Sequence, residues 1–432
     1  MKIYLVSLGC SKNLVDSEMI LGAIENGQIV TDANEADLMI VNTCGFIEAA
    51  KEEAIKTILD LADIKKGNQK LVVVGCLAQR YKKELESSMP EVDRFLAISE
   101  YNKLGEILNA LTNEHAFTDT INPLKRVLST GNKSVYVKIS EGCNNRCAYC
   151  AIPLIRGNLQ SRTIESIYEE VLELVKSGAK EINLISQDTT NYGFDLYKKP
   201  AIIPLLEKLL TIKDIKWIRM LYLYPTLVTD EFISFIKNNP KVLPYFDIPV
   251  QHSETRVLKS MLRRGTKEEY LAMFKKIRQE IPNSVLRTTM IVGFPTETEE
   301  EFNDLIEFVK EVQFDRLGAF PYSKEEDTKA YEYEDQIPEK IKNQRYSELM
   351  EVQKWISLAQ NKKHLNQIEE VFIEGYDEEM LMYYGRSYAH APDDIDGCIY
   401  VAALEELQVG QIIKAKIVDC DFYTLTAEQV LE

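Results

Sequence analysis

The sequence has few of the features that would place a protein in a membrane, in a repeat array or on a nucleic acid. None of its apolar runs, in 432 residues, approaches the roughly 20 residues that a membrane-spanning helix requires. No segment repeats at a solenoid period, and none has low complexity. Basic residues are outnumbered, with 51 Lys and Arg against 68 Asp and Glu, and the net charge of −17 disfavours phosphate backbones. We therefore expect neither a membrane nor a nucleic acid as partner, and the charge favours a basic one.

The chain also lacks the marks of a secretory signal. Residues 1–7 offer one positive charge and a short apolar run before Gly9, which fits a buried strand better. We therefore expect a cytoplasmic protein whose eight cysteines stay reduced. In such a protein, clustered cysteines indicate metal ligands or catalytic thiols rather than disulfides, so their spacing carries the main information.

The first third of the chain contains three apolar runs, each followed by a stretch with helical periodicity. This pattern predicts a parallel α/β sheet. Each run ends at a cysteine: residues 3–8 at Cys10, residues 38–42 at Cys44 and residues 71–75 at Cys76. Ligands of such sheets lie beyond the carboxyl ends of the strands, so the three thiols are expected to converge there. The alternative is that they are small buried hydrophobic residues.

A polar passage over residues 109–133 separates this region from a second series of strand-like runs, most of them divided by helical segments. One helix, at residues 164–177, has Thr163 as its N-cap and Gly178 as its stop. Six strand–helix repeats are too few for an eight-stranded barrel and predict an open, TIM-like (β/α)6 partial barrel. The strand-like runs are residues 134–139, 181–186, 217–223, 245–250, 285–292 and 315–320.

Helix formers over residues 338–367 precede short alternating runs, which predict a small all-β domain. These runs are residues 371–374, 380–384, 398–401 and 412–419. The overall prediction is an α/β protein with a parallel-sheet domain at residues 1–125, the partial barrel at 134–366 and the β domain at 367–432.

A second group of cysteines, Cys143, Cys147 and Cys150, follows the first barrel strand in CxxxCxxC spacing. Barrels of this kind place active sites at that end of their strands. Three thiolates can hold three irons of a 4Fe-4S cluster and leave the fourth iron open, whereas electron-transfer clusters commonly have four thiolates. The alternative is structural zinc, which usually takes four ligands. None of the four histidines lies close in sequence to this group: His115, His252, His364 and His390.

The CxxxCxxC loop resembles the signature of the radical S-adenosylmethionine (SAM) superfamily, and two cysteine trios in one chain resemble its methylthiotransferase family. That family has an N-terminal cluster domain, a radical barrel and a C-terminal β module called TRAM, which together would cover nearly the whole chain. The resemblance implies two 4Fe-4S clusters and SAM as cofactors. Cys143, Cys147 and Cys150 would bind the radical-generating cluster as catalytic residues, and Cys10, Cys44 and Cys76 the sulfur-carrying one.

The resemblance also implies residues that contact SAM. Tyr149 would lie next to the adenine, and other side chains at strand ends would contact the methionine and ribose parts: Ser186, Gln187, Asp188, Arg219 and Gln251. Each could instead be a packing residue or a solvated strand end. Residues 291–298 resemble a late-barrel motif of the superfamily, although Gly293 and Pro295 within them could be ordinary turn residues.

The family modifies either an adenosine of transfer RNA or an aspartate of the twelfth protein of the small ribosomal subunit. Residues 7–18, 41–47, 139–143, 152–157 and 185–189 resemble the ribosomal branch. Two departures are Ser11, where proline is expected, and an extra residue within 391–397. Residues 367–432 carry three Lys and Arg against fifteen Asp and Glu, a net charge of −12, which suits a basic ribosomal protein. The charge could also serve solubility alone.

The implied reaction replaces a hydrogen on the aspartate β-carbon with a methylthio group. It also implies an electron donor, such as flavodoxin or ferredoxin, and a sulfur donor. Two alternatives stay open from the sequence: methylthiolation of transfer RNA adenosine, and a non-enzymatic iron-sulfur or zinc protein that acts as a sensor or scaffold.

Overall fold

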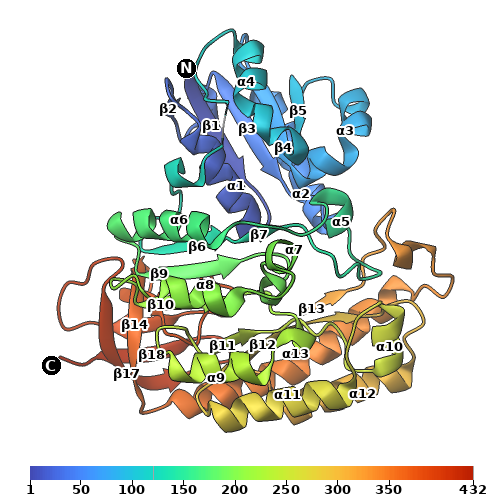
Figure 1. Cartoon of the computed structure of the whole chain (residues 1–432), viewed down its shortest axis with the longest axis vertical. Coiled ribbons are helices and arrows are strands. Elements are labelled where there is room, and N and C mark those ends of the chain that lie inside the picture. Colours follow the sequence, from blue (N-terminus) through green and yellow to red (C-terminus); the bar gives the residue numbers. More distant parts are fainter. Residues whose placement is uncertain (120, 432) are drawn as a thin grey trace.

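The computed structural model describes residues 1–119 and 121–431 and begins with a five-stranded parallel sheet (Figure 1). Its order is β2-β1-β3-β4-β5. The strands are β1 (Lys2–Ser7), β2 (Gln28–Ile29), β3 (Leu38–Thr43), β4 (Lys70–Gly75) and β5 (Arg94–Ala97). The three predicted strands are therefore present, each within one residue of its expected bounds. Runs such as LMIVNT in β3 are buried along their whole length because helices cover both faces of the sheet.

Four helices form the two covering layers: α1 (Ser11–Gly22), α2 (Glu48–Ile64), α3 (Cys76–Ser88) and α4 (Leu104–Thr112). Alternate residues of β3 divide between the layers, with Met39 packing beneath α2 and α3 and Ile40 beneath α1 and α4. The helix α4 extends four residues into the polar passage that the sequence indicated from residue 109. The connection beyond it contains one short 3-10 turn, Pro123–Lys125.

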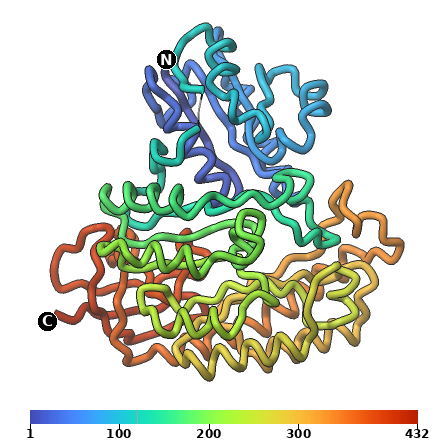
Figure 2. The backbone as a smooth tube through the Cα atoms, in the orientation of Figure 1, coloured from blue at the N-terminus to red at the C-terminus, as the bar shows by residue number. Residues whose placement is uncertain are grey.

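The middle of the chain, green to orange in Figure 2, forms the predicted open partial barrel. Its six parallel strands follow one another in sequence order, and Figure 1 labels them. They are β6 (Ser134–Lys138), β9 (Glu181–Ile185), β10 (Trp217–Met220), β11 (Tyr245–Asp247), β12 (Val285–Val292) and β13 (Arg316–Pro321). The two three-stranded halves meet at a bridge between Ile218 and Val242. No pairing between β6 and β13 occurs among the described residues, so the barrel is open.

Helices follow the strands of the barrel, and most of them cover its outside. They are α5 (Ile152–Ile155), α6 (Ile164–Lys176), α7 (Phe194–Tyr197), α8 (Ile202–Leu209), α9 (Asp230–Asn238), α10 (Thr255–Ser260), α11 (Lys267–Glu280), α12 (Glu299–Val312) and α13 (Glu339–Asn361). The predicted N-cap of α6 is confirmed, since the Thr163 hydroxyl accepts the Ser166 N–H at 3.2 Å, and Gly178 follows the helix at a φ of +107°. A short antiparallel pair, β7 (Ser140–Glu141) and β8 (Gln160–Ser161), lies above β6.

Two barrel strands end earlier than predicted. The run at residues 217–223 leaves the sheet after Met220, because Tyr222 adopts a φ of +62° that interrupts extended backbone. The run at residues 245–250 leaves it after Asp247, shortly before Gln251, whose φ is +73°. The carboxyl rim of the barrel is therefore made of irregular backbone, which can direct side chains inward.

The C-terminal module is a closed five-stranded barrel in the order β14-β15-β16-β18-β17. Its strands are β14 (Ile368–Asp377), β15 (Met382–Arg386), β16 (Ile399–Ala402), β17 (Ile412–Cys420) and β18 (Leu425–Gln429). The predicted all-β module is confirmed, but the sequence did not indicate β18. That strand buries Leu425, Ala427 and Gln429, and only one of these is a large apolar residue.

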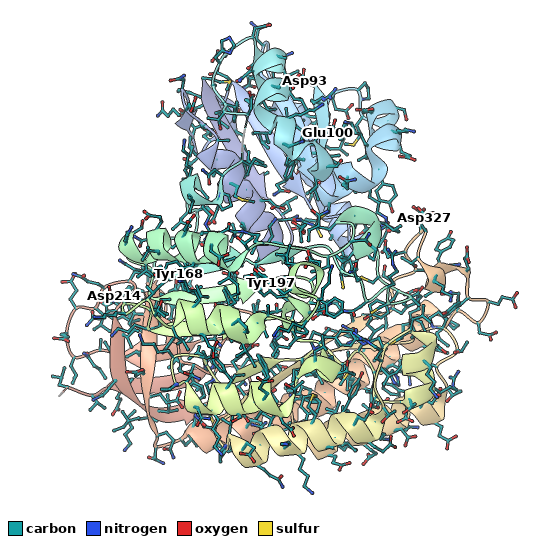
Figure 3. The ribbon with its side chains drawn as sticks, in the orientation of Figure 1. Asp93, Glu100, Tyr168, Tyr197, Asp214 and Asp327 are labelled. Atoms are coloured by element: carbon teal, nitrogen blue, oxygen red, sulfur yellow. The ribbon has the colours of Figure 1, made fainter. Side chains whose placement is uncertain are left out.

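The interior of the partial barrel is closed by segments from the other two regions. Between β15 and β16, Ala389 and Ala391 pack against Trp217 and Tyr245 at the amino ends of the barrel strands. Arg386 binds Glu181 there at 2.7 Å. Helix α1 contributes Val15 and Met19 to the same interior cluster. Side chains occupy the space between the ribbons of the N-terminal sheet and the barrel (Figure 3). None of the described helices is both long and apolar enough to span a bilayer.

Candidate metal centres

The first cysteine trio stands at one edge of the N-terminal sheet. Strands β1, β3 and β4 are neighbours, and their register aligns Ser7 with Asn42 and Thr43 with Gly75. The carboxyl ends therefore lie side by side. Cys10, Cys44 and Cys76 each follow one of these ends, and two of the three also begin helices, since Cys10 caps α1 and Cys76 opens α3. The sheet brings the three cysteines together, as the sequence predicts.

Close backbone packing holds this trio. A Cβ atom on Gly9 would lie 2.6 Å from the Cys44 Cβ and 3.2 Å from its Sγ, so the chain before Cys10 lies directly against Cys44. On the other side, a Cβ atom on Gly45 would lie 3.0 Å from the carbonyl carbon of Cys76. Asn13 fixes the turn, because its amide donates to the carbonyls of Leu8 and Thr43 at 3.0 Å each.

Two thiols of this trio have raised pKa values, and their neighbours contribute to the shifts. Burial raises the pKa of the Cys44 thiol to about 12, with further contributions from Cys76 and Cys10. Burial also raises the pKa of Cys76, and the nearby Arg156 opposes that shift. Buried thiols that resist ionisation, such as Cys44 and Cys76, are stabilised when a metal replaces the protons, and the third thiol of this trio, Cys10, is exposed.

The second trio lies in one loop at the carboxyl end of β6. Gly142, at a φ of +72°, lets the loop pass against the neighbouring chain, where a Cβ would lie 2.2 Å from the Asn158 carbonyl oxygen. The Asn145 N–H lies 3.5 Å from the Cys143 Sγ. Burial raises the pKa of Cys143 to about 11, followed by the charges of Asp188 and Cys147. Burial likewise raises the pKa of Cys150, with added repulsion from the other two thiols of the loop.

The donor sets fit two iron-sulfur clusters. Each trio supplies three neighbouring sulfurs, and the two remaining cysteines, Cys398 and Cys420, belong to the C-terminal barrel. Among residues 1–119 and 121–431, no three His, Cys, Asp or Glu side chains are grouped around a point that would hold a single metal ion. A cubane cluster occupies the space between its thiolates, so that finding concerns single ions and not clusters.

A buried charged network joins the two trios. Arg156 donates to the Cys76 Sγ at 3.4 Å and to the Asp16 carboxylate at 2.8 Å. It also donates to Glu141, next to the second cysteine loop, at 3.0 Å. Lys138 binds both carboxylates. Although burial of Glu141 opposes ionisation, Lys138 and Arg156 lower its pKa to about 2. The sequence resemblance named Arg156 only as part of a motif and missed this role, because its partners come from three distant segments.

Four of the predicted SAM-contacting residues gather around the second trio. Tyr149 is partly buried and its hydroxyl accepts from Arg263 at 3.1 Å, while the same guanidinium lies 3.6 Å from the Cys147 Sγ. Asp188 accepts from the Asn145 amide at 2.7 Å. Gln187 donates to Glu141 at 2.9 Å, and the hydroxyl of Ser186 lies 3.3 Å from that of Thr189. No motif in the sequence points to Arg263, since only the fold brings it near a loop more than a hundred positions earlier.

The other two predicted SAM-contacting residues, Arg219 and Gln251, are placed differently from these four. The Arg219 guanidinium is fully buried, binds Glu181 at 3.0 Å and donates to the Tyr388 carbonyl at 2.9 Å. These partners lie at the amino ends of the strands, away from the cysteine loop. Gln251 lies at the rim, where its backbone N–H donates to the Thr289 carbonyl at 2.9 Å and its carbonyl accepts from Ile291 at 2.8 Å.

The motif at residues 291–298 packs against the cysteine loop. Phe294 packs in one apolar cluster with Ala148 and Tyr149. The Gly293 N–H donates to the buried Glu297 carboxylate, and Arg345 on α13 binds the same carboxylate at 2.7 Å. The motif therefore has a packing role here, and its glycine allows a φ of +70°.

Three family descriptions match separate parts of the chain. Residues 2–97 match the description "Uncharacterized protein family UPF0004", residues 137–309 match "Radical SAM superfamily", and residues 367–430 match "TRAM domain". Among solved structures, the radical SAM methyltransferase TsrM from Kitasatospora setae has a TM-score of 0.55 at 12% identity, with 74% of each chain covered. The cobalamin-dependent radical enzyme OxsB has a TM-score of 0.51 at 13% identity and covers 82% of this chain and 56% of its own. These two show the fold alone.

Curated relatives are far more similar. A protein of Clostridium novyi is 47% identical over 433 residues, covering 98% of this chain and 97% of its own. One of Clostridium botulinum (strain Loch Maree / Type A3) is 49% identical, covering 96% and 95%. One of Carboxydothermus hydrogenoformans is 47% identical, covering 99% of both. All three carry the name "Ribosomal protein uS12 methylthiotransferase RimO".

Proposed function

The chain belongs to the RimO family of ribosomal protein uS12 methylthiotransferases, and we propose that it attaches a methylthio group to the β-carbon of an aspartate in uS12. It is a radical SAM enzyme, whose cofactors are SAM and 4Fe-4S clusters. The observation that carries the proposal is the pair of cysteine trios joined by Arg156. Sulfur insertion needs a sulfur source and a radical source close to one carbon atom.

In this proposal, Cys10, Cys44 and Cys76 hold one cluster, and the loop cysteines Cys143, Cys147 and Cys150 hold the other. When bound, the clusters and SAM supply an electron for C–S cleavage, a sulfur atom and a methyl group. The chain's own residues hold these groups apart from water. Burial of Cys44 and Cys76 keeps solvent from two of the three thiols of the first trio, and Arg263 places a positive charge beside Cys147.

The nucleotide would occupy the rim of the barrel beside the second trio. Tyr149 would contact the adenine, while Ser186, Gln187, Asp188 and Gln251 would line the methionine and ribose parts. Arg219 is left out of this site, because Glu181 and the Tyr388 carbonyl engage its guanidinium at the other end of the strands. Asp188 is held for its role by Asn145, which comes from the cysteine loop itself.

The charge of the C-terminal module supports a basic protein substrate. Residues 367–432 carry fifteen acidic residues against three basic ones, and long-range attraction between opposite charges speeds encounter. The same charge would repel transfer RNA. We further propose a cytoplasmic enzyme with units at residues 1–125, 134–366 and 367–432, served by a reductant such as flavodoxin or ferredoxin and by a sulfur donor.

Anaerobic reconstitution tests this function. The protein, supplied with SAM, a reductant and a sulfur source, is incubated separately with uS12 and with transfer RNA, and both products are examined by mass spectrometry. We expect a methylthio group on one aspartate of uS12 and none on the RNA. Modified RNA with unmodified uS12 would contradict the proposal, and a protein that binds zinc and does not cleave SAM would exclude the whole enzyme class.

A further inference from the structure

Lys12 is a buried cation without a carboxylate partner. It is the second residue of α1, and its relative exposure is 6%. Some other buried cations of the chain reach carboxylates, as Arg156 does with Asp16, whereas Arg263 and Arg316 donate to backbone carbonyls instead. In the described part of the chain, no Asp or Glu lies within ion-pair distance of the Lys12 ammonium. Its contact is the ring of Tyr222, whose centroid lies 3.4 Å from Nζ.

A cation in this environment favours an incoming anion. Removing an ammonium group from water is costly unless an opposite charge compensates for it, and an aromatic face compensates only in part. The Tyr222 ring also fixes where the ammonium lies. A pre-positioned, partly compensated charge gives a site that is selective for negatively charged ligands.

Lys12 lies on the route between the two cysteine trios. It is two residues from Cys10, on the same helix that carries Asp16 to Arg156. Its partner Tyr222 belongs to the carboxyl rim of the barrel, where the Tyr222 carbonyl accepts the Thr189 N–H at 3.0 Å. Thr189 directly follows Asp188, which binds the second cysteine loop. Lys12 therefore links the helix that begins at the first trio to the barrel rim that borders the second trio.

We propose that Lys12 binds the side-chain carboxylate of the substrate aspartate, as a specificity-determining residue. This inference rests on the proposed function and deepens it. The carbon that is modified carries that carboxylate directly, so a carbon placed between the sulfur source and the radical source brings its carboxylate to the same place. The carboxylate of SAM is a less suitable occupant, since the methionine part of SAM is expected at the barrel rim beside the second trio and not beside Cys10.

Binding measured without reductant tests the assignment, because no turnover then occurs. The reconstituted enzyme with SAM is titrated with uS12 and with a uS12 variant in which the target aspartate is replaced by asparagine. We expect the wild type to bind the aspartate form at least about tenfold more tightly, the usual effect of removing one partner of a buried charge pair. Lys12→Met should remove this preference by weakening binding of the aspartate form alone.

Two further variants sharpen the result. Lys56→Met removes one positive charge from an exposed position on α2 and should keep the full preference. Lys12→Arg keeps a cation at the site and should retain part of the preference, which leaves the proposal testable if Lys12→Met does not fold.

Three outcomes would overturn the assignment. They are an undiminished preference for aspartate in Lys12→Met, a wild type that does not distinguish the two forms of uS12, and a loss of SAM affinity in Lys12→Met with the preference intact. A wild type that neither binds nor modifies uS12 is a different result, since it refutes the proposed function itself.

Discussion

The two cysteine trios reach the same arrangement by different routes. Cys10, Cys44 and Cys76 lie on three separate strand ends, and only the register of a parallel sheet makes them neighbours. Cys143, Cys147 and Cys150 lie within one loop, where local backbone geometry suffices. The first trio is a property of the whole N-terminal fold, and the second is a property of a short sequence. The first should therefore be lost through packing changes that leave the second intact.

The largest expected effect separates the trios chemically. Cys147→Ala should abolish SAM cleavage and hence all methylthiolation. Cys44→Ala should abolish methylthiolation but leave reductive SAM cleavage, because the loop trio does not depend on Cys44. Product analysis for 5'-deoxyadenosine and for modified uS12 distinguishes the two results. Loss of SAM cleavage in both variants would mean that the trios are not independent.

A packing change should break the first trio alone. Gly9→Ala places a Cβ 2.6 Å from the Cys44 Cβ at a φ of +85°, so the Cys10 turn must move. We expect iron content to fall by about half, from roughly eight to four per chain, with the loop cluster retained. Gly131→Ala is the matched control. It has a φ of +89° and nothing within 4 Å of the added Cβ, so it carries only the backbone strain of about 1–2 kcal/mol.

The converse pair tests the loop. Gly142→Ala would meet the Asn158 carbonyl oxygen at 2.2 Å, whereas Gly157→Ala, at a φ of +74°, meets nothing within 4 Å. Gly142→Ala should therefore reduce SAM cleavage strongly and Gly157→Ala only slightly. Equal effects of the two substitutions, measured as SAM turnover per iron, would show that backbone strain and not packing governs the loop.

The bridge between the trios should contribute strongly to stability. Arg156→Leu leaves the buried Asp16 and the partly buried Glu141 with one fewer cation, and breaking such a network costs about 3–5 kcal/mol. Urea unfolding of the cysteine-reduced protein without clusters measures this loss directly. Arg156→Lys should keep part of the stability that Arg156→Leu loses, since one ammonium cannot reach all the partners of a guanidinium. A change in the free energy of unfolding below about 1 kcal/mol in Arg156→Leu would indicate that water solvates the charged groups around Arg156.

A smaller effect concerns the opposite end of the barrel, where no site is proposed. Although burial of Glu181 opposes ionisation, Arg386 and Arg219 lower its pKa to about 2. Glu181 therefore stabilises the fold fully above its ordinary pKa of about 4.5, and this contribution declines as the pH falls from there toward 2. Glu181→Gln should cost about 3 kcal/mol at pH 7 and progressively less below pH 4.5, without changing SAM affinity. A constant difference in unfolding free energy from pH 7 to pH 3 would contradict this assignment.

The sequence predicted those parts of the molecule that depend on local pattern. The buried runs identified β1, β3 and β4, and the spacing of Cys143 to Cys150 identified the loop without any knowledge of the fold. The sequence does not predict β18, because its inward positions include only one large apolar side chain. The contacts of Arg156, Arg263 and Lys12 depend on segments far apart in the chain. Arg219 was assigned to the nucleotide from its strand, but strand position does not say toward which end a long side chain extends.

The central claim is that six thiolates hold two separate clusters on either side of the Arg156 bridge. Anomalous diffraction at the iron absorption edge, from crystals of the anaerobically reconstituted protein, tests it most directly. We expect two distinct iron sites, one beside Cys10, Cys44 and Cys76 and one beside Cys143, Cys147 and Cys150. A single iron site, or iron bound by any other residues, would contradict the account.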